Sequence, residues 1–168
     1  MRLKQVCFIV VALFFLPLMS FAQNANTLVD WKSLRSFTNG DSPIVQEGDK
    51  VVLLDFWASW CGPCRQSFPW MNAMKVKYGD KGLRIVAVNL DSDKAEAMAF
   101  LSEVTAEFAV LFDQEGQSAE MLSVEAMPMS YLIKTNGEVI SRMAGFNTPK
   151  QAVHEQHIRQ SLELNESE

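Results

Sequence analysis

The stretch KVVLLDFW, residues 50–57, constrains the fold of this chain more than any other feature. Apolar side chains occupy almost every position rather than alternate ones, a pattern typical of a strand buried on both faces of a parallel sheet. The stretch LRIVAVNL, residues 83–90, repeats it. Between them, residues 62 to about 78 favour a helix, which we expect to be interrupted at Pro69. A buried strand, a helix and a second buried strand predict an α/β fold.

The second half of the chain continues the alternation of helices and strands. We expect a helix over 92–104 with Ser92 as its N-cap, a strand over 108–113, a short helix over 117–124, a hairpin over 129–143 and a helix over 149–164. The dipeptide Asn136-Gly137 is a strong hairpin signal. Because hairpin strands are antiparallel, the predicted sheet is mixed and flanked by helices. Core positions are predicted for a set of methionines and phenylalanines: Phe56, Met71, Met74, Met98, Phe100, Phe108 and Phe112.

The first 22 residues have the pattern of a secretory signal peptide. Two cations, Arg2 and Lys4, precede an apolar stretch that is too short for a typical membrane span, and the segment ends in Ser20-Phe21-Ala22. We therefore expect cleavage before Gln23 and an extracytoplasmic location, with an uncleaved membrane anchor as the alternative. The net charge of −5 disfavours a nucleic-acid partner.

Two cysteines, Cys61 and Cys64, remain after removal of this segment, which contains Cys7. They stand in WCGPC, directly after the first buried strand, so they lie at the edge of the sheet where a helix begins. The partial positive charge of a helix N-terminus favours the thiolate of Cys61, and Cys64 lies one turn further on the same face. This arrangement predicts a dithiol exchange centre, in which Cys61 attacks and Cys64 resolves.

Metal binding is the alternative for these cysteines. Zinc would need two more ligands, and His154 with His157 are the candidates, although a polar late helix more often carries such histidines on its surface. Thiolates also suit copper(I), so a copper-binding chaperone remains open.

Asp55 and Pro128 are two further candidate residues of the site. Asp55 lies within an apolar strand, where burial would raise its pKa towards the range useful for proton transfer; an aspartate at a strand end that reaches water is the alternative. Pro128 stands at the entrance of a predicted strand, where proline cannot donate a ladder hydrogen bond. Met127 and Met129 flank it and could face a substrate.

The segments LLDFWASWCGPCRQSFP and AMPMSYLIKTNGEVISRMAGF, with the helix and strand at 92–113, resemble the thioredoxin superfamily, and most of all its secreted TlpA/ResA-like branch. The resemblance covers residues 48–165 as a thioredoxin-like domain and leaves 23–47 as an N-terminal extension. It implies a thioredoxin fold with a helix-strand insertion and a redox-active Cys61–Cys64 disulfide. It also implies that Pro128 is cis, that the backbone at Met127 pairs with a substrate peptide, that Trp60 flanks the sulfurs and that Gly145 leaves room for the substrate.

Two departures from the family pattern concern proton handling. Many members of the branch carry a glutamate three residues after the second cysteine, where this chain has Ser67, and the segment IVAVNL lacks the lysine that thioredoxins place near the buried acid. In this chain, proton handling is therefore expected to rest on Asp55 and water.

The dipeptide Gly62-Pro63 matches strongly reducing thioredoxins, with potentials of about −270 mV. We expect a protein-disulfide reductase that works as a monomer without a cofactor and is re-reduced by a membrane thiol-disulfide electron donor. By resemblance, its candidate substrates are cysteine pairs of apocytochromes c or of copper-centre assembly proteins. A disulfide oxidant or isomerase is the alternative within the enzyme class.

Overall fold

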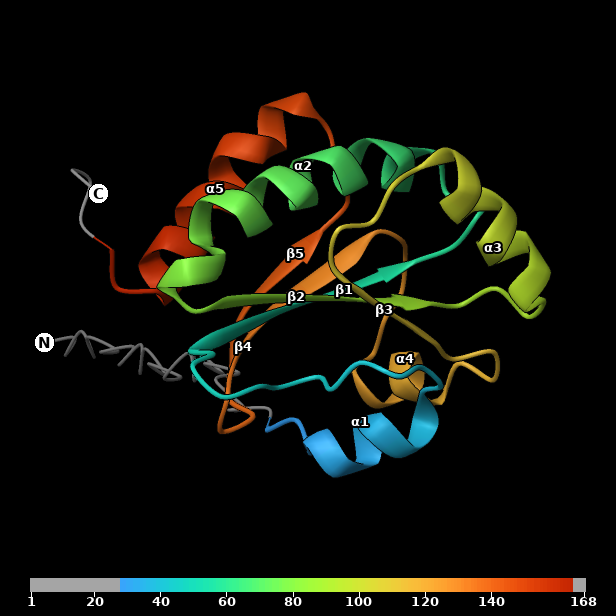
Figure 1. Ribbon diagram of the computed structural model, residues 1–168, viewed down its shortest axis with the longest axis horizontal. Coiled ribbons are helices and arrows are strands. Elements are labelled where there is room, and N and C mark those ends of the chain that lie inside the picture. The colour runs from blue at the N-terminus through green and yellow to red at the C-terminus, as the bar shows by residue number, and fades with distance from the viewer. Residues whose placement is uncertain (1–27, 165–168) are drawn as a thin grey trace, which may run out of the picture.

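The computed structural model of this chain describes residues 28–164 (Figure 1). The expected signal segment, the cleavage position before Gln23 and the C-terminal residues 165–168 lie outside the described part. None of the helices among residues 28–164 is long and apolar enough to cross a membrane.

A five-stranded mixed sheet forms the centre of the fold. Its strands are β1 (Val51–Trp57), β2 (Leu83–Asn89), β3 (Ala109–Phe112), β4 (Met129–Lys134) and β5 (Val139–Ala144). They lie in the order β3-β2-β1-β4-β5, so β1 is the central strand. The pairs β1–β2 and β2–β3 are parallel, whereas β1–β4 and β4–β5 are antiparallel. The predicted mixed sheet is thereby confirmed, and it places the end of β1 beside the end of β2.

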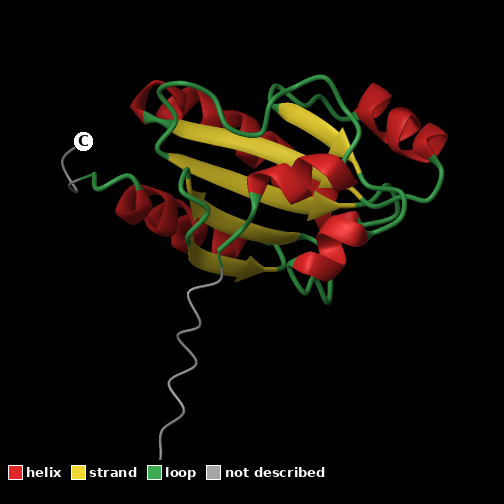
Figure 2. Cartoon of the chain, turned by 90° about the horizontal axis from the view of Figure 1, so that it is seen from below, coloured by secondary structure: helices red, strands yellow, loops and turns green. Residues whose placement is uncertain are grey.

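Helices cover both faces of this sheet (Figures 1 and 2). One layer holds α2 (Gly62–Tyr78), α3 (Lys94–Glu103) and α5 (Thr148–Ser161), with a short 3₁₀ turn, η1 (Gly79–Lys81), after α2. The other layer holds two short helices, α1 (Trp31–Phe37) and α4 (Gln117–Met121). Because both faces are covered, every side chain of β1 is buried, which explains its continuous apolar run.

Successive residues of β1 point to opposite layers. Leu53 and Trp57 pack with the core beneath α2, whereas Leu54 and Phe56 pack with the core on the side of α1 and α4. The alternation places Asp55 on the same face as Leu53 and Trp57, under the helix that begins at the cysteines.

The expected interruption of the second helix is wrong, because α2 continues through Pro69. Proline removes the hydrogen bond that its own nitrogen would donate to the carbonyl of Arg65, and its ring crowds that carbonyl. Buried side chains on both sides of it, Phe68, Trp70 and Met71, hold the helix against the sheet. Tertiary packing thus outweighs the local preference of proline.

Two expectations for α3 are also wrong. Its N-cap is Asp93 rather than Ser92, and the Asp93 carboxylate accepts a hydrogen bond of 2.8 Å from the backbone N–H of Ala95. A carboxylate also complements the partial charge of the helix N-terminus. Met98 is 51% exposed, because α3 buries Ala97 and Phe100 and the next position along the helix turns outward. The other methionines and phenylalanines predicted for the core are buried.

Residues ahead of β1 pack against the same sheet. Val29, Leu34 and Ile44 belong to the core beneath α1 and α4. The backbone N–H of Val29 donates to the carbonyl of Gly137 in the β4–β5 turn. Gly137 has a φ of +92°, and a Cβ there would lie 2.3 Å from the Val29 carbonyl oxygen. The glycine that favours the turn therefore also leaves room for the segment around Val29 to pack against it.

Candidate active site

Cys61 and Cys64 form a disulfide at the carboxyl end of the central strand, with their Cα atoms 5.3 Å apart. The chain leaves β1 at Trp57 and turns once, with the N–H of Cys61 donating to the carbonyl of Ala58 over 3.1 Å. Cys61 is the N-cap residue of α2, and its side chain makes no capping hydrogen bond. The first N–H groups of α2 thus lie next to the sulfur of Cys61.

The two sulfurs differ in their surroundings. Cys64 is fully buried, whereas Cys61 is 4% exposed and lies between the exposed residues Trp60 and Gly62. The helix N-terminus lowers the energy of a thiolate at Cys61, and Pro63 occupies a position of the first turn where a missing N–H is tolerated. Ser67 is buried, and its hydroxyl donates to the Cys64 carbonyl over 3.0 Å. This hydrogen bond links the Ser67 side chain to the helix backbone at the resolving cysteine.

A buried carboxylate anchors the turn before Cys61. Asp91 follows β2 and accepts hydrogen bonds from the backbone N–H of Ser59 at 2.8 Å and from its hydroxyl at 3.0 Å. The side-chain amide of Asn89 donates to the same carboxylate over 2.7 Å. Nothing local in the sequence marks Asp91 as a residue of the site, because its partner lies 32 residues earlier in the chain. The contact joins the ends of β1 and β2 one residue before Trp60.

Asp55 is only 1% exposed and has one hydrogen-bond donor among the described residues, the Ser130 hydroxyl at 2.6 Å. Burial raises the pKa of Asp55 from 3.8 to about 7, and the hydrogen bond from Ser130 acts in the opposite direction. The alternative of an aspartate that reaches water at a strand end is therefore wrong. Ser130 was not singled out in the sequence, since nothing local marks it as the partner of an acid 75 residues away.

The Met127–Pro128 peptide bond is cis and immediately precedes β4. Gly145 follows β5, and its N–H donates to the carbonyl of Pro128 over 2.8 Å. Its φ of +67° suits glycine, and a Cβ would lie 3.1 Å from the Lys150 ammonium nitrogen. Met127 is half-buried against the core beneath α2, whereas Met129 is buried on the opposite face of the sheet and does not face a substrate.

The two histidines proposed as zinc ligands contact residues other than the cysteines. His154 is buried between Trp70 and Phe146, with ring centroids 5.9 Å from each, so the expectation of a surface histidine is wrong. The rings of Trp70 and Phe146 cover the side of α5 that carries His154. His157 instead approaches Ser141, with Nδ1 3.2 Å from the hydroxyl oxygen. Within residues 28–164, no three His, Cys, Asp or Glu side chains gather as metal ligands.

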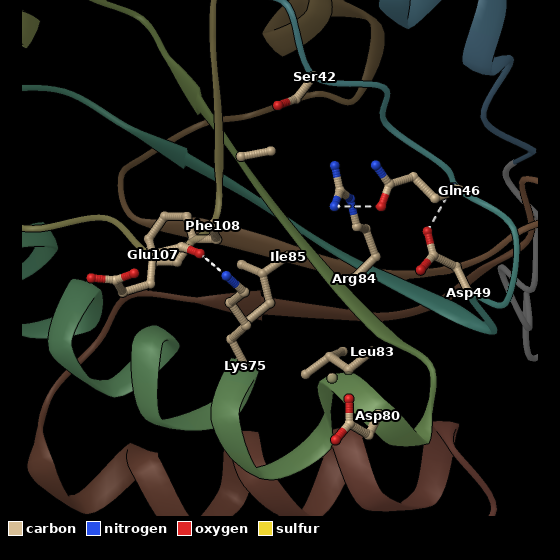
Figure 3. A pocket seen from close by; sticks show the side chains of 12 residues that line it. Ser42, Gln46, Asp49, Lys75, Asp80, Leu83, Arg84, Ile85, Glu107 and Phe108 are labelled. Atoms are coloured by element: carbon tan, nitrogen blue, oxygen red, sulfur yellow. Dashed lines mark hydrogen bonds between the residues drawn. The ribbon is translucent and has the colours of Figure 1, made fainter.

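A polar cavity of about 490 Å³ lies at the opposite edge of the sheet, where β2 and β3 begin (Figure 3). Its two cationic side chains have partners: Arg84 donates to the Gln46 side chain and to the Pro43 carbonyl, and Lys75 donates to the Glu107 carbonyl. The disulfide lies at the carboxyl end of β1, so this cavity is separate from it.

Comparison with known proteins agrees with this geometry. The Redoxin family model matches residues 41–158. The thiol-disulfide oxidoreductase ResA of Oceanobacillus iheyensis is 38% identical over 59% of this chain, and the chain spans about half, 53%, of that relative's length. The thioredoxin-like protein YneN of Bacillus subtilis is 35% identical over 71% of both chains.

A crystal structure from Chlorobium tepidum, described as a thiol:disulfide interchange protein DsbE, superposes with a TM-score of 0.66. It is 52% identical in sequence, and the match covers 68% of this chain and 82% of the other. The disulfide, the cis-proline and the sheet order are thus found in a chain whose sequence matches the family over most of its length. The chain belongs to the redoxin family and adopts the thioredoxin fold.

Proposed function

We propose that this protein is an extracytoplasmic thiol-disulfide oxidoreductase that reduces disulfides in other proteins. The observation that carries the proposal is the Cys61–Cys64 disulfide at the N-terminus of α2, with the more exposed sulfur at the N-cap. A thiolate is favoured at that position, and a thiolate is the species that attacks a disulfide.

Two exchange steps account for the reaction. The Cys61 thiolate attacks one sulfur of the substrate disulfide, a mixed disulfide forms, and the other substrate sulfur leaves as a thiolate. Cys64 then gives up its proton and attacks Cys61, which closes the protein disulfide and releases the second substrate thiolate. Two electrons pass from the protein dithiol to the substrate. Asp55, buried on the face that α2 covers, accepts the proton of Cys64.

The residues around the disulfide supply the docking site for the substrate. Trp60 is 71% exposed beside Cys61 and offers an aromatic surface. Met127 precedes the cis-proline, where its backbone pairs with an extended peptide that carries the reacting cysteine. Gly145 lies next to Pro128 through its backbone hydrogen bond and keeps this edge free of a side chain.

The direction of electron flow follows from the residues between the cysteines. Gly62-Pro63 is the dipeptide of strongly reducing thioredoxins, so the dithiol donates electrons and the oxidised protein must be re-reduced after each turnover. A membrane thiol-disulfide donor suits the extracytoplasmic location that residues 1–22 predict. Cysteine pairs of apocytochromes c or of copper-centre assembly proteins are the proposed substrates.

Trapping of the mixed disulfide tests this function. Cys64→Ser removes the resolving thiol, so Cys61 should remain bound to its substrate, and the adducts should disappear on treatment with dithiothreitol. The matched control is Cys61→Ser, which keeps Cys64 but should trap at most traces, because Cys64 is fully buried. Equal trapping by both variants would contradict the assignment of the attacking sulfur. No adducts from either would contradict the exchange reaction.

A further inference from the structure

The hydroxyl of Ser130 is the feature of the buried site that the proposed function leaves unused. Ser130 stands directly opposite Asp55 in the antiparallel pairing of β4 with β1. Its neighbours in β4, Met129 and Tyr131, belong to the core on the other face, so Ser130 points to the same side as Asp55. The hydroxyl oxygen lies 2.6 Å from Oδ1 of Asp55.

The two oxygens of the Asp55 carboxyl are therefore unequal. Oδ1 accepts the hydrogen bond from Ser130, whereas Oδ2 is buried and has no hydrogen-bond partner among the described residues. A buried polar atom without a partner is rare in folded proteins and is often found at functional sites. Oδ2 is thus the atom of this carboxyl that is free to take a proton.

We propose that Ser130 is a positioning residue for proton transfer: its hydroxyl occupies Oδ1 of Asp55 and leaves Oδ2 to accept the proton of Cys64. This inference rests on the proposed function. In the resolving step the Cys64 S–H bond breaks, the proton goes to Oδ2, and the sulfur bonds to Cys61 while the substrate thiolate leaves. The proton moves to the substrate thiolate or to water after the product departs, which restores the carboxylate.

Ser130 also sets the balance between the two forms of the acid. A donated hydrogen bond stabilises the carboxylate and opposes the effect of burial. No charged side chain among the described residues contributes to the pKa of Asp55. On the neighbouring elements, β2 brings Ala87 beside it. The titratable side chains that α2 buries on this face of the sheet are Cys61 and Cys64, which are thiols in the reduced protein, and Tyr78 at the other end of the helix. Without Ser130, the acid would hold its proton at neutral pH.

Titration of the Asp55 carboxyl carbon by NMR in the oxidised protein tests the hydrogen bond without any turnover. Loss of a hydrogen bond to a charged group should raise the proton affinity of Asp55 in Ser130→Ala by about tenfold, or about one pH unit. Ser130→Thr keeps the hydroxyl and should titrate like the wild type. The matched control is Tyr131→Phe, which removes a buried hydroxyl bonded to the Leu122 carbonyl on the opposite face.

The reaction of the reduced protein with dithiobis(nitrobenzoate) tests the proton transfer itself. The first thionitrobenzoate released reports the attack by Cys61, and the second reports resolution by Cys64. In Ser130→Ala the pH midpoint of the second phase should rise by about one unit, because a general base acts only when deprotonated. Ser130→Thr should restore the midpoint, and Tyr131→Phe should leave it unchanged even if that variant is less stable.

The outcomes separate this inference from the function on which it rests. A shifted Asp55 titration together with a shifted second phase supports the role of Ser130. An unshifted titration in folded Ser130→Ala overturns it, and so does a shifted titration with an unchanged second phase. If the wild-type protein releases no second thionitrobenzoate at any pH, the exchange function itself fails, and this inference fails with it.

Discussion

Replacement of Asp55 by asparagine should make the protein more stable, and increasingly so as the pH rises. The variant keeps the shape of the protonated acid, and its side-chain oxygen can still accept the hydrogen bond from Ser130. It removes a carboxylate that, when charged, loses its hydration as the protein folds. Near pH 4, where the wild-type acid is protonated in the fold, we expect both proteins to have similar free energies of unfolding.

The magnitude follows from the pKa of Asp55, which burial raises from 3.8 to about 7 in the fold. The folded protein binds this proton more tightly than the unfolded chain, so the contribution to stability is fully present at acid pH. It is lost as the pH rises from about 4 to about 7. At about 1.4 kcal/mol per pH unit, the total loss is about 4 kcal/mol. Between about pH 5 and about pH 8.5, the linkage relation gives about 3 kcal/mol.

Equilibrium unfolding by urea of the oxidised wild type and of Asp55→Asn at these two pH values measures the effect. The difference between the two proteins cancels the titration of every other group that the substitution leaves unchanged. Asp55→Asn should gain about 3 kcal/mol on the wild type between the two pH values. Parallel pH dependence of both proteins, within about 0.5 kcal/mol, would refute the assignment of a raised pKa to this residue.

Three further substitutions test the surroundings of the site. Phe100→Ala should lower the free energy of unfolding, measured by urea unfolding, by about 3–5 kcal/mol, because Phe100 is buried against Trp57 and Phe68. Its control is Val76→Ala at an 83% exposed position, which should change the free energy of unfolding by less than about 0.5 kcal/mol. Asp91→Ala should lower the free energy of unfolding by about 1–3 kcal/mol, because the donors of Ser59 and Asn89 lose their buried acceptor; an unchanged free energy of unfolding would contradict this. Gly145→Ala should lower the thermal midpoint, because φ is +67° at that position, and an unchanged midpoint would contradict that reading.

The strands and helices of this fold could be predicted from the sequence because the patterns that mark them are local. Continuous apolar runs marked β1 and β2, and the Asn136-Gly137 dipeptide marked the β4–β5 turn. The position of the cysteines followed from the same signals, since a motif directly after a buried strand must lie at the strand's carboxyl end. These features depend on residues that are close together in the chain.

The features that the sequence did not predict depend on contacts between distant segments. Asp55 meets Ser130 only because β1 and β4 pair in one particular register, and Asp91 meets Ser59 only because β1 and β2 end side by side. Local rules also gave way to packing elsewhere. Pro69 stays within a helix that the sheet holds in place, and His154 is buried by the rings of Trp70 in α2 and Phe146 in the β5–α5 loop.

The reduction potential of the Cys61–Cys64 pair decides whether this protein reduces or forms disulfides. The purified protein would be equilibrated with dithiothreitol or glutathione buffers and its free thiols trapped and counted. We expect a potential near that of thioredoxin, about −270 mV. A value near that of the strong oxidant DsbA, about −120 mV, differs by about 7 kcal/mol in the free energy of reduction. Such a value would contradict the reductase assignment and identify the protein as a donor of disulfides.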